Sequence, residues 1–254
     1  MSVKKVLVIR FRRIGDAVLS VVICSSIRKS FPEAEIHYVL NDHIAPLFEN
    51  HPDIDKIITF SDEENNHFFK YLRKVRQLMK TERYDVIIDT RATIKTLWFS
   101  AFSLRTKYRI GTSKFYNHFF HNYRVRNHVN DDLDEVVRNL LLLRPLERER
   151  KLIMTTDFRL YVTEQETAEF KSYMEQKGIN FSRFIVVCTP FTRVARKAWD
   201  MAKMKEILSR IIQRYGAQLI FNYSRIEKEA ALALYEDMGK DEHIFIDIEA
   251  DSLR

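Results

Sequence analysis

Apolar and polar positions alternate along the chain in blocks that predict strands and helices in turn. Residues 6–9 form a short, unbroken apolar run with basic flanks, which is typical of a central parallel strand covered on both faces. Across residues 16–27 apolar side chains recur at helical spacing, and Pro32 prevents this helix from extending further. Residues 35–40 return to a strand pattern. The amino-terminal segment therefore predicts a βαβ unit.

The same alternation continues to the end of the chain. Further strands are predicted at residues 57–60, 85–89, 108–111, 158–162, 184–188, 217–222 and 243–248. Further helices are predicted at residues 67–79, 131–143, 163–178, 199–215 and 226–238. The charged, proline-containing stretch 144–151 is typical of a connection between lobes. We therefore expect an α/β protein with two Rossmann-like lobes, at residues 1–155 and 156–254.

A Gly-Asp pair follows the first predicted strand, at the edge where open α/β sheets bind their ligands. Gly15 is the only glycine before Gly111, so we expect a tight turn there or a close approach of backbone to ligand. Asp16 has two interpretations that the sequence leaves open. Its carboxylate could cap the helix that follows, or it could act as a general base toward an attacking hydroxyl.

Composition is that of a globular protein, with 46% hydrophobic and 30% charged residues in a chain of 254. No apolar run approaches the roughly 20 residues needed to span a bilayer, so we expect a cytoplasmic protein. Cys24 and Cys188 lie in apolar runs and are expected to be reduced core residues. Neither a dinucleotide fingerprint nor a phosphate-binding loop is present. His118 and His121 lack a third ligand in a zinc pattern, and we expect no metal and no cofactor.

The net charge of +7 favours an anionic partner, which could be nucleic acid, anionic lipid or a phosphorylated glycan. Basic and aromatic residues are interleaved across residues 105–126, a composition that suits stacked bases, sugars or a membrane surface. No nucleic-acid fold signature surrounds them, and we expect no nucleic acid. The alternative is a set of core aromatic residues with a solvated basic face.

The residues of 4–10, 14–20 and 31–36 together resemble the amino terminus of glycosyltransferase family 9, the ADP-heptose:lipopolysaccharide heptosyltransferases. The resemblance implies that Asp16 is the catalytic base. Arg12 and Arg13 stand where many members have small hydroxyl residues, and permanently charged forked donors suit an anionic acceptor. The family also has an acceptor-facing loop after the strand at 85–89. Arg91 and Lys95 are therefore candidate acceptor contacts.

The second lobe continues the resemblance. Thr189 after a predicted strand, followed by Lys197 before Trp199, matches the family's donor-phosphate segment, and a lysine there can offset the charge of a departing nucleoside diphosphate. Alone, Lys197 would be a surface lysine and Trp199 a core residue. Glu227 fits the family's donor-contacting glutamate, although the glycines that usually precede it are absent. We group Gly15 with these donor-binding residues.

The resemblance implies the GT-B arrangement and an inverting transfer of heptose from ADP-heptose to a lipopolysaccharide core acceptor, with peripheral contact at the inner membrane surface. The family's Asp-x-Gly-x-x-His segment is missing after Gly239, so we expect the second lobe to be incomplete. A different class of function also remains open. A degenerate, non-catalytic member could bind an anionic glycan, lipid or nucleic acid.

Overall fold

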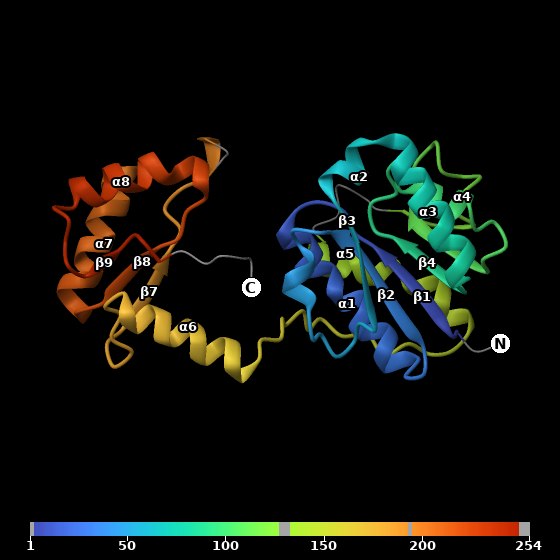
Figure 1. The fold of residues 1–254 in the computed structure, drawn as a ribbon, viewed down its shortest axis with the longest axis horizontal. Helices are drawn as coiled ribbons and strands as arrows, with labels where there is room; N and C mark the ends of the chain where they lie inside the picture. Colours follow the sequence, from blue (N-terminus) through green and yellow to red (C-terminus); the bar gives the residue numbers. More distant parts are fainter. Residues whose placement is uncertain (1–2, 127–132, 193–194, 249–254) are drawn as a thin grey trace. The chain divides into compact units, whose positions relative to one another are not determined.

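The computed structural model describes residues 3–126, 133–192 and 195–248. The chain divides into two compact units, the first reaching Tyr161 and the second beginning at Val162. Each unit holds a parallel sheet with helices, as Figure 1 shows, and the predicted α/β class is confirmed.

The first unit contains a parallel sheet in the order β3-β2-β1-β4-β5-β6. Its strands are β1 Lys5–Ile9, β2 Glu35–Asn41, β3 Lys56–Phe60, β4 Val86–Asp89, β5 Tyr108–Thr112 and β6 Tyr123–Val125. Its helices are α1 Ile14–Ser30, α2 Asp62–Asn66, α3 Phe68–Glu82, α4 Leu97–Ala101 and α5 Glu135–Leu141, with 3-10 turns at Ala45–Phe48 and Arg144–Arg148. The chain reverses direction across the sheet between β3 and β4, beside the central strand β1.

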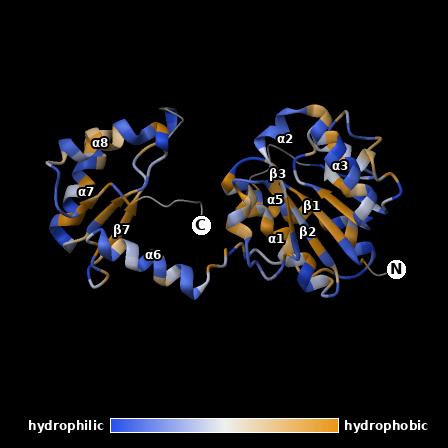
Figure 2. Cartoon of the chain, viewed as in Figure 1, coloured by the Kyte–Doolittle hydropathy of each residue, from blue (hydrophilic) through white to orange (hydrophobic). Residues whose placement is uncertain are grey.

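The sheet of the first unit is covered on both faces, as the unbroken apolar run of β1 predicts. Val6 and Val8 pack with α1 and α5 in one core, whereas Leu7 and Ile9 pack with α3 and α4 in a second core. Figures 1 and 2 show these helices on either side of apolar strands. Each such side chain contributes about 1.5–3 kcal/mol by leaving water, so β1 is held firmly from both faces of the sheet.

Two expectations about the end of the first unit are wrong. Residues 144–151 are not the connection between the lobes, because the first unit reaches Tyr161 and Arg144–Arg148 forms a 3-10 turn whose Leu146 is fully buried in the α1 and α5 core. Residues 158–162 form no strand, since no neighbouring strand pairs with them in the described sheets. The helix expected at 131–143 begins at Glu135, capped by Asp134, and positions 131 and 132 lie outside the described residues.

The second unit has a smaller parallel sheet in the order β7-β8-β9. Its strands are β7 Ile185–Cys188, β8 Gln218–Phe221 and β9 Ile244–Phe245. Its helices are α6 Glu164–Gln176, α7 Met201–Tyr215 and α8 Lys228–Asp237, with 3-10 turns at Ala195–Lys197 and Arg225–Glu227. Residues from α7 and α8 pack on one core of this unit, and Met174 of α6 packs in another with Ile220 of β8.

The strand expected to be buried at residues 184–188 is only partly buried. Val187 is 63% exposed because β7 is an edge strand, and α6 covers the neighbouring Ile185 instead. Cys24 and Cys188 are both free and buried, as expected, and burial raises the pKa of both thiols. Among the described residues, none of the helices has the length and apolar character that crossing a bilayer requires.

Candidate functional site

The carboxylate of Asp16 lies beside the carboxyl end of β1, held by an arginine. Nη2 of Arg10 is 2.7 Å from Oδ2 of Asp16. The Arg10 side chain is only 5% exposed, whereas that of Asp16 is 29% exposed. The guanidinium also contacts Oε1 of Glu135 at 3.4 Å and donates to Oγ1 of Thr90 at 3.3 Å. A buried cation thus fixes a partly exposed carboxylate at the edge of the sheet.

The cap interpretation of Asp16 is wrong. Helix α1 begins at Ile14 with Arg13 as its N-cap, so Asp16 is the third helical residue, and no side chain caps the N-terminus. The carboxylate still lies in the first turn, where the positive end of the helix dipole favours it. It pairs with the Arg10 guanidinium rather than capping the backbone N–H groups of the turn.

The tight turn before α1 is made by arginines and not by the glycine. Arg12 and Arg13 have φ of 64° and 58°, in the left-handed region that favours glycine. The Arg12 N–H donates to Oδ1 of Asn41 at 2.9 Å, which holds the turn against β2. Gly15 has an ordinary helical backbone, and a Cβ placed on it would meet nothing within 4 Å. The space beside Gly15 is therefore open.

The loop after β4 carries both acceptor candidates. Oδ1 of Asp89 accepts hydrogen bonds from the N–H groups of Arg91 and Ala92, and Thr90 Oγ1 donates to the Ile9 carbonyl at 2.9 Å. Lys95 is partly buried at the other end of the loop. These contacts fasten the loop to β1 and β4, next to the Arg10 and Asp16 pair.

The ammonium group of Lys95 is already engaged within the first unit. Nζ donates to the carbonyl and Oδ1 of Asn65, at 2.6 and 2.8 Å, and lies 4.6 Å from the Tyr71 ring centroid. Burial lowers the pKa of Lys95, and the charge of Arg12 lowers it further. Two cations are thus close together, which makes this corner of the site electropositive.

The donor candidates of the second unit follow two adjacent strands, β7 and β8. Thr189 comes directly after β7, and the turn after β8 carries Ser224 and Glu227 in a capping box. Oε2 of Glu227 accepts from the N–H and the hydroxyl of Ser224, at 2.8 and 2.6 Å. Lys197 is exposed, and Trp199 is 48% exposed, so Trp199 is not the core residue of the alternative interpretation.

The basic and aromatic stretch of 105–126 contains both buried structural residues and exposed aromatic residues. Arg109 is buried and donates to the carbonyl groups of Leu104, Thr106 and Phe120, so it is a structural residue. Phe115 and Phe119 are 89% and 76% exposed, so the core interpretation fails for them.

A buried Asp–His pair lies beneath the loop after β4, and the sequence pattern did not reveal it. Oδ2 of Asp89 is 3.8 Å from Nε2 of His121, and neither atom has a hydrogen-bond partner among the described residues. Burial raises the pKa of Asp89, opposed by the charge of His121, and burial lowers the pKa of His121, opposed by Asp89. These residues are 32 positions apart, and only the pairing of β4 with β5 brings them together.

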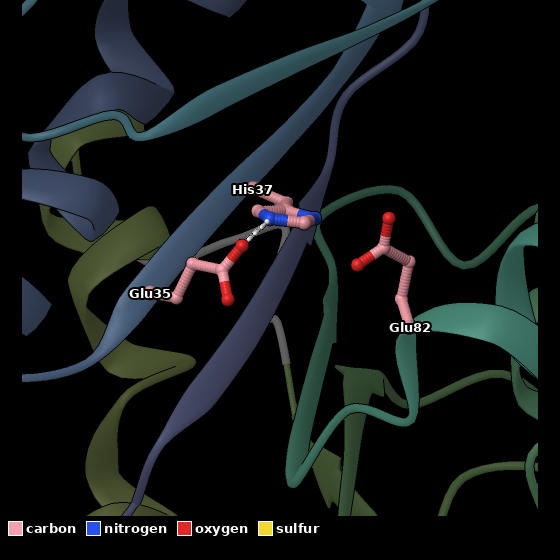
Figure 3. A group of neighbouring side chains, drawn as sticks. All are labelled: Glu35, His37 and Glu82. Carbon is pink, nitrogen blue, oxygen red and sulfur yellow. Dashed lines mark hydrogen bonds and ion pairs between the residues drawn. The ribbon is translucent and has the colours of Figure 1, made fainter.

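A second cluster of side chains could in principle bind a metal ion: Glu35, His37 and Glu82, which Figure 3 shows. One carboxylate or imidazole atom of each lies within 4.8 Å of those of the other two. The ammonium of Lys5 occupies this cluster, since it lies 3.0 Å from Glu35 and 2.5 Å from Glu82. The two ring nitrogens of His37 bond to Tyr84 and Glu35. The cluster lies at the amino ends of β1 and β2, opposite the edge that carries Asp16, and its charges are balanced by lysine.

Comparisons with known proteins identify the family of this chain. Residues 72–240 match the family described as glycosyltransferase family 9 (heptosyltransferase). Lipopolysaccharide heptosyltransferase 3 of Escherichia coli (strain K12) is 26% identical over 216 residues, which cover 81% of this chain and 59% of that protein. Lipopolysaccharide heptosyltransferase 1 of Campylobacter coli is 24% identical over 135 residues, covering 52% of this chain and 38% of that protein. The chain therefore spans less than two thirds of these relatives.

Solved structures show the same fold. A family 9 glycosyltransferase from Veillonella parvula DSM 2008 aligns with a TM-score of 0.82 at 16% identity, covering 96% of this chain and 69% of that one. The E. coli heptosyltransferase WaaC, solved with ADP-2-deoxy-2-fluoro heptose, aligns with a TM-score of 0.67 at 15% identity, covering 98% and 77%. These likenesses confirm the predicted GT-B fold class. The chain belongs to glycosyltransferase family 9 (heptosyltransferase).

Proposed function

We propose that this chain carries the machinery of an inverting glycosyltransferase that moves a heptose, or a related sugar, from ADP-heptose to a lipopolysaccharide core acceptor. Family membership and two lipopolysaccharide heptosyltransferase relatives support the proposal. The observation that carries it is the Asp16 carboxylate, which is 29% exposed and fixed by the buried Arg10 at the ligand-binding edge of the sheet.

Asp16 accepts the proton of the acceptor hydroxyl. As the O–H bond breaks, the acceptor oxygen forms a bond to the anomeric carbon, and the bond between that carbon and the diphosphate oxygen breaks. The nucleoside diphosphate leaves with the bonding electron pair, and the configuration inverts because attack and departure occur on opposite sides. Arg10 keeps the carboxylate in place, so little reorganisation is needed when the proton moves.

The second unit supplies the donor contacts in this proposal. Lys197 and the hydroxyl of Thr189 bind the diphosphate and offset the charge that develops on the leaving group. Glu227 contacts the donor from a turn that its own capping box with Ser224 keeps rigid. Gly15 leaves open space beside Asp16 for the sugar. The donor is a substrate, and the proposal includes no cofactor.

The acceptor is anionic in this proposal, because the turn before Asp16 and the loop after β4 both carry cations. Arg12, Arg13, Arg91 and Lys95 bind its phosphate or carboxylate groups. Burial lowers the pKa of Lys95 and the charge of Arg12 lowers it further, and an acceptor anion would relieve the repulsion between these two cations. Arginine is suited to such groups because its planar fork binds two oxygens at once.

The same unit is proposed to touch the inner membrane surface, where a lipid-anchored acceptor would lie. The sequence from Thr90 to Asn130 contains no aspartate or glutamate, and its basic residues suit anionic headgroups. Phe69, Phe115 and Phe119 are 83%, 89% and 76% exposed, and aromatic side chains favour the polar–apolar boundary.

The test is Asp16→Asn, which keeps the shape of the side chain and removes its basicity. With ADP-heptose and a phosphorylated core acceptor, release of ADP per folded molecule is expected to fall by about 10²–10⁴-fold. The unfolding midpoint is expected to fall as well, because the buried Arg10 loses one of its two carboxylate partners. Unchanged turnover would refute the base role. Binding of the acceptor with a steep salt dependence, and no release of ADP by the unmodified protein, would favour the non-catalytic alternative.

A further inference from the structure

The buried ends of β4 and β5 form a layer directly beneath the loop of residues 90–96. Asp89 is the last residue of β4 and lies in register with Ile9 of β1 on one side and Gly111 of β5 on the other. Its carboxylate is fully buried, and its two oxygens face different groups. Oδ1 accepts from the N–H groups of Arg91 and Ala92, whereas Oδ2 faces His121 at 3.8 Å.

A hydrogen-bond network fixes the orientation of the His121 ring. Nδ2 of Asn117 donates to the Thr112 carbonyl at 2.8 Å and to Nδ1 of His121 at 3.1 Å, while Oδ1 of Asn117 accepts from the Lys114 N–H at 3.1 Å. The amide can take only one orientation in this network, so Nδ1 is the acceptor and Nε2 of the neutral ring carries the proton. That N–H faces the Asp89 carboxylate.

The His121 ring packs against the backbone of Gly111, where any side chain would collide with the ring. A Cβ on Gly111 would lie 2.5 Å from two atoms of the His121 ring, so the ring packs directly over the glycine. Ala92, whose N–H donates to Asp89, has a φ of 48°, a left-handed conformation that costs energy for an alanine. Its carbonyl accepts from the hydroxyl of Tyr116, on the segment that also holds His121.

We propose that Asp89 and His121 are a buried positioning pair that holds the loop of residues 90–96 in the conformation that presents Arg91 and Lys95 to the acceptor. The contacts of this pair with the loop come from the structure. That the loop binds the acceptor rests on the proposed function. Both side chains are at most 1% exposed, so neither touches substrate. They act through the loop, and the strained backbone at Ala92 is held because Asp89 binds its N–H group and Tyr116 its carbonyl.

Electrostatics give the pair its coupling. The Nε2–H of the neutral His121 ring faces the Asp89 carboxylate, and burial together with the charges of Arg109 and Arg124 disfavours a positive charge on the ring. Because neither Oδ2 nor Nε2 has another partner among the described residues, each depends on the other for compensation. Removing His121 leaves a buried carboxylate without this partner, and the loop amides are the groups bonded to that carboxylate.

The kinetic test compares His121→Gln and Asp89→Asn with His118→Gln. His118 lies in the same segment but is exposed and bonds only locally, through Nδ1 to the Phe115 carbonyl, so it controls for the loss of a histidine. In the ADP-release assay we expect the acceptor KM to rise about tenfold in the two test variants, with the donor KM and the control unchanged. An unchanged acceptor KM, or an equal rise in the donor KM, would overturn the proposal.

A second measurement is independent of turnover. Amide hydrogen exchange of the 254-residue chain without substrate is expected to be about tenfold faster at Arg91 and Ala92 in His121→Gln, with β2 amides unchanged. If the unmodified protein releases no ADP, the proposed function is wrong. The exchange measurement then still tests whether Asp89 and His121 hold the loop. Unchanged exchange in the loop, or faster exchange throughout the first unit, would overturn it.

Discussion

Arg10 and Asp16 form an ion pair across the first strand-to-helix turn, with 2.7 Å between Nη2 and Oδ2. The pair joins the end of β1 to the first turn of α1, and the guanidinium reaches on to Glu135 of α5. An arginine with 5% exposure is tolerated because carboxylates compensate its charge. The position of the proposed base is therefore set by the central strand β1 of the unit.

The first prediction tests this dependence with Arg10→Lys. Lysine keeps the charge but loses the planar guanidinium, whose Nη2 contacts Asp16 and Glu135 while Nη1 donates to Thr90, so the carboxylate is no longer held in one place. We expect turnover to fall about tenfold or more, with a small change in the KM of either substrate. Glu135→Gln is the matched control, because it changes the longer 3.4 Å contact and leaves the Asp16 pair. An equal loss of turnover in both variants would contradict the assignment.

Gly15→Ala tests whether Gly15 is needed for binding the donor sugar or only for the stability of the fold. The glycine has an ordinary helical φ and open space where a Cβ would lie, and alanine is the better helix former. We expect the free energy of unfolding to stay the same or rise by up to about 1 kcal/mol. Turnover should fall, because the added methyl group occupies space proposed for the sugar. Urea unfolding and the ADP-release assay measure the two effects, and full activity would exclude Gly15 from the donor site.

The sequence predicted the first βαβ unit and the place of Asp16 because both follow from local pattern. A continuous apolar run requires cover on both faces, and a carboxylate after it must emerge at the ligand-binding edge. The role of Arg10 could not be predicted in this way. Its burial depends on Glu135, which is 125 residues away along the chain, and a basic residue beside a strand is usually solvated.

Local preference misplaced the turn for a similar reason. Positive φ favours glycine, so Gly15 was the expected turning point, yet the structure puts Arg12 and Arg13 in that conformation. The bond from the Arg12 N–H to Asn41 comes from the adjacent strand β2 and holds the turn there. Leu146 shows the same limit, because charged neighbours suggest a connection although its side chain completes the core. In each case a distant contact overrides the local signal.

Arg13→Gly tests the strain in that turn. Glycine takes a φ of 58° without a steric penalty and is also accepted as an N-cap, so we expect the free energy of unfolding to rise by about 1 kcal/mol. Binding of a phosphorylated core acceptor should weaken because one cation is lost. Arg83→Gly is the control, since Arg83 has a φ of 50° at the end of α3 and belongs to no proposed site. Acceptor affinity equal in both variants would remove Arg13 from the acceptor site.

Glu82 gives the first unit a pH-dependent stability. Hydrogen bonds from Lys5 and Lys56 lower the pKa of Glu82 from 4.5 to about 2, against the opposing effect of burial. The folded state therefore binds this proton more weakly than the unfolded state. The contribution is complete above pH 4.5 and disappears as the pH falls through about 2.

The matching variant is Glu82→Gln, which should lower the free energy of unfolding at neutral pH by about 1–2 kcal/mol, less than the full shift because water screens these pairs. The difference from the unmodified protein should shrink steadily from pH 4.5 toward 2. Glu63→Gln, which removes an exposed pair with Lys70, serves as the control and should change stability little. Urea unfolding at several pH values measures this, and a difference independent of pH would contradict the assignment.

Gly111 and His121 are predicted to be energetically coupled. Gly111→Ala places a methyl group 2.5 Å from the buried imidazole, and the ring cannot move without leaving Asn117 and Asp89. We expect a loss of about 1–3 kcal/mol in the free energy of unfolding.

The double variant Gly111→Ala with His121→Ala removes the clash, because the methyl group then fills part of the space left by the ring. Its destabilisation should be smaller than the sum of the two single variants by about 1 kcal/mol or more. Fluorescence of Trp98 during urea unfolding, in a Trp199→Phe background, reports the first unit, since the sequence contains only these two tryptophans. Additive effects would show that the ring does not depend on the glycine, and the packing beneath the acceptor loop would then need another explanation.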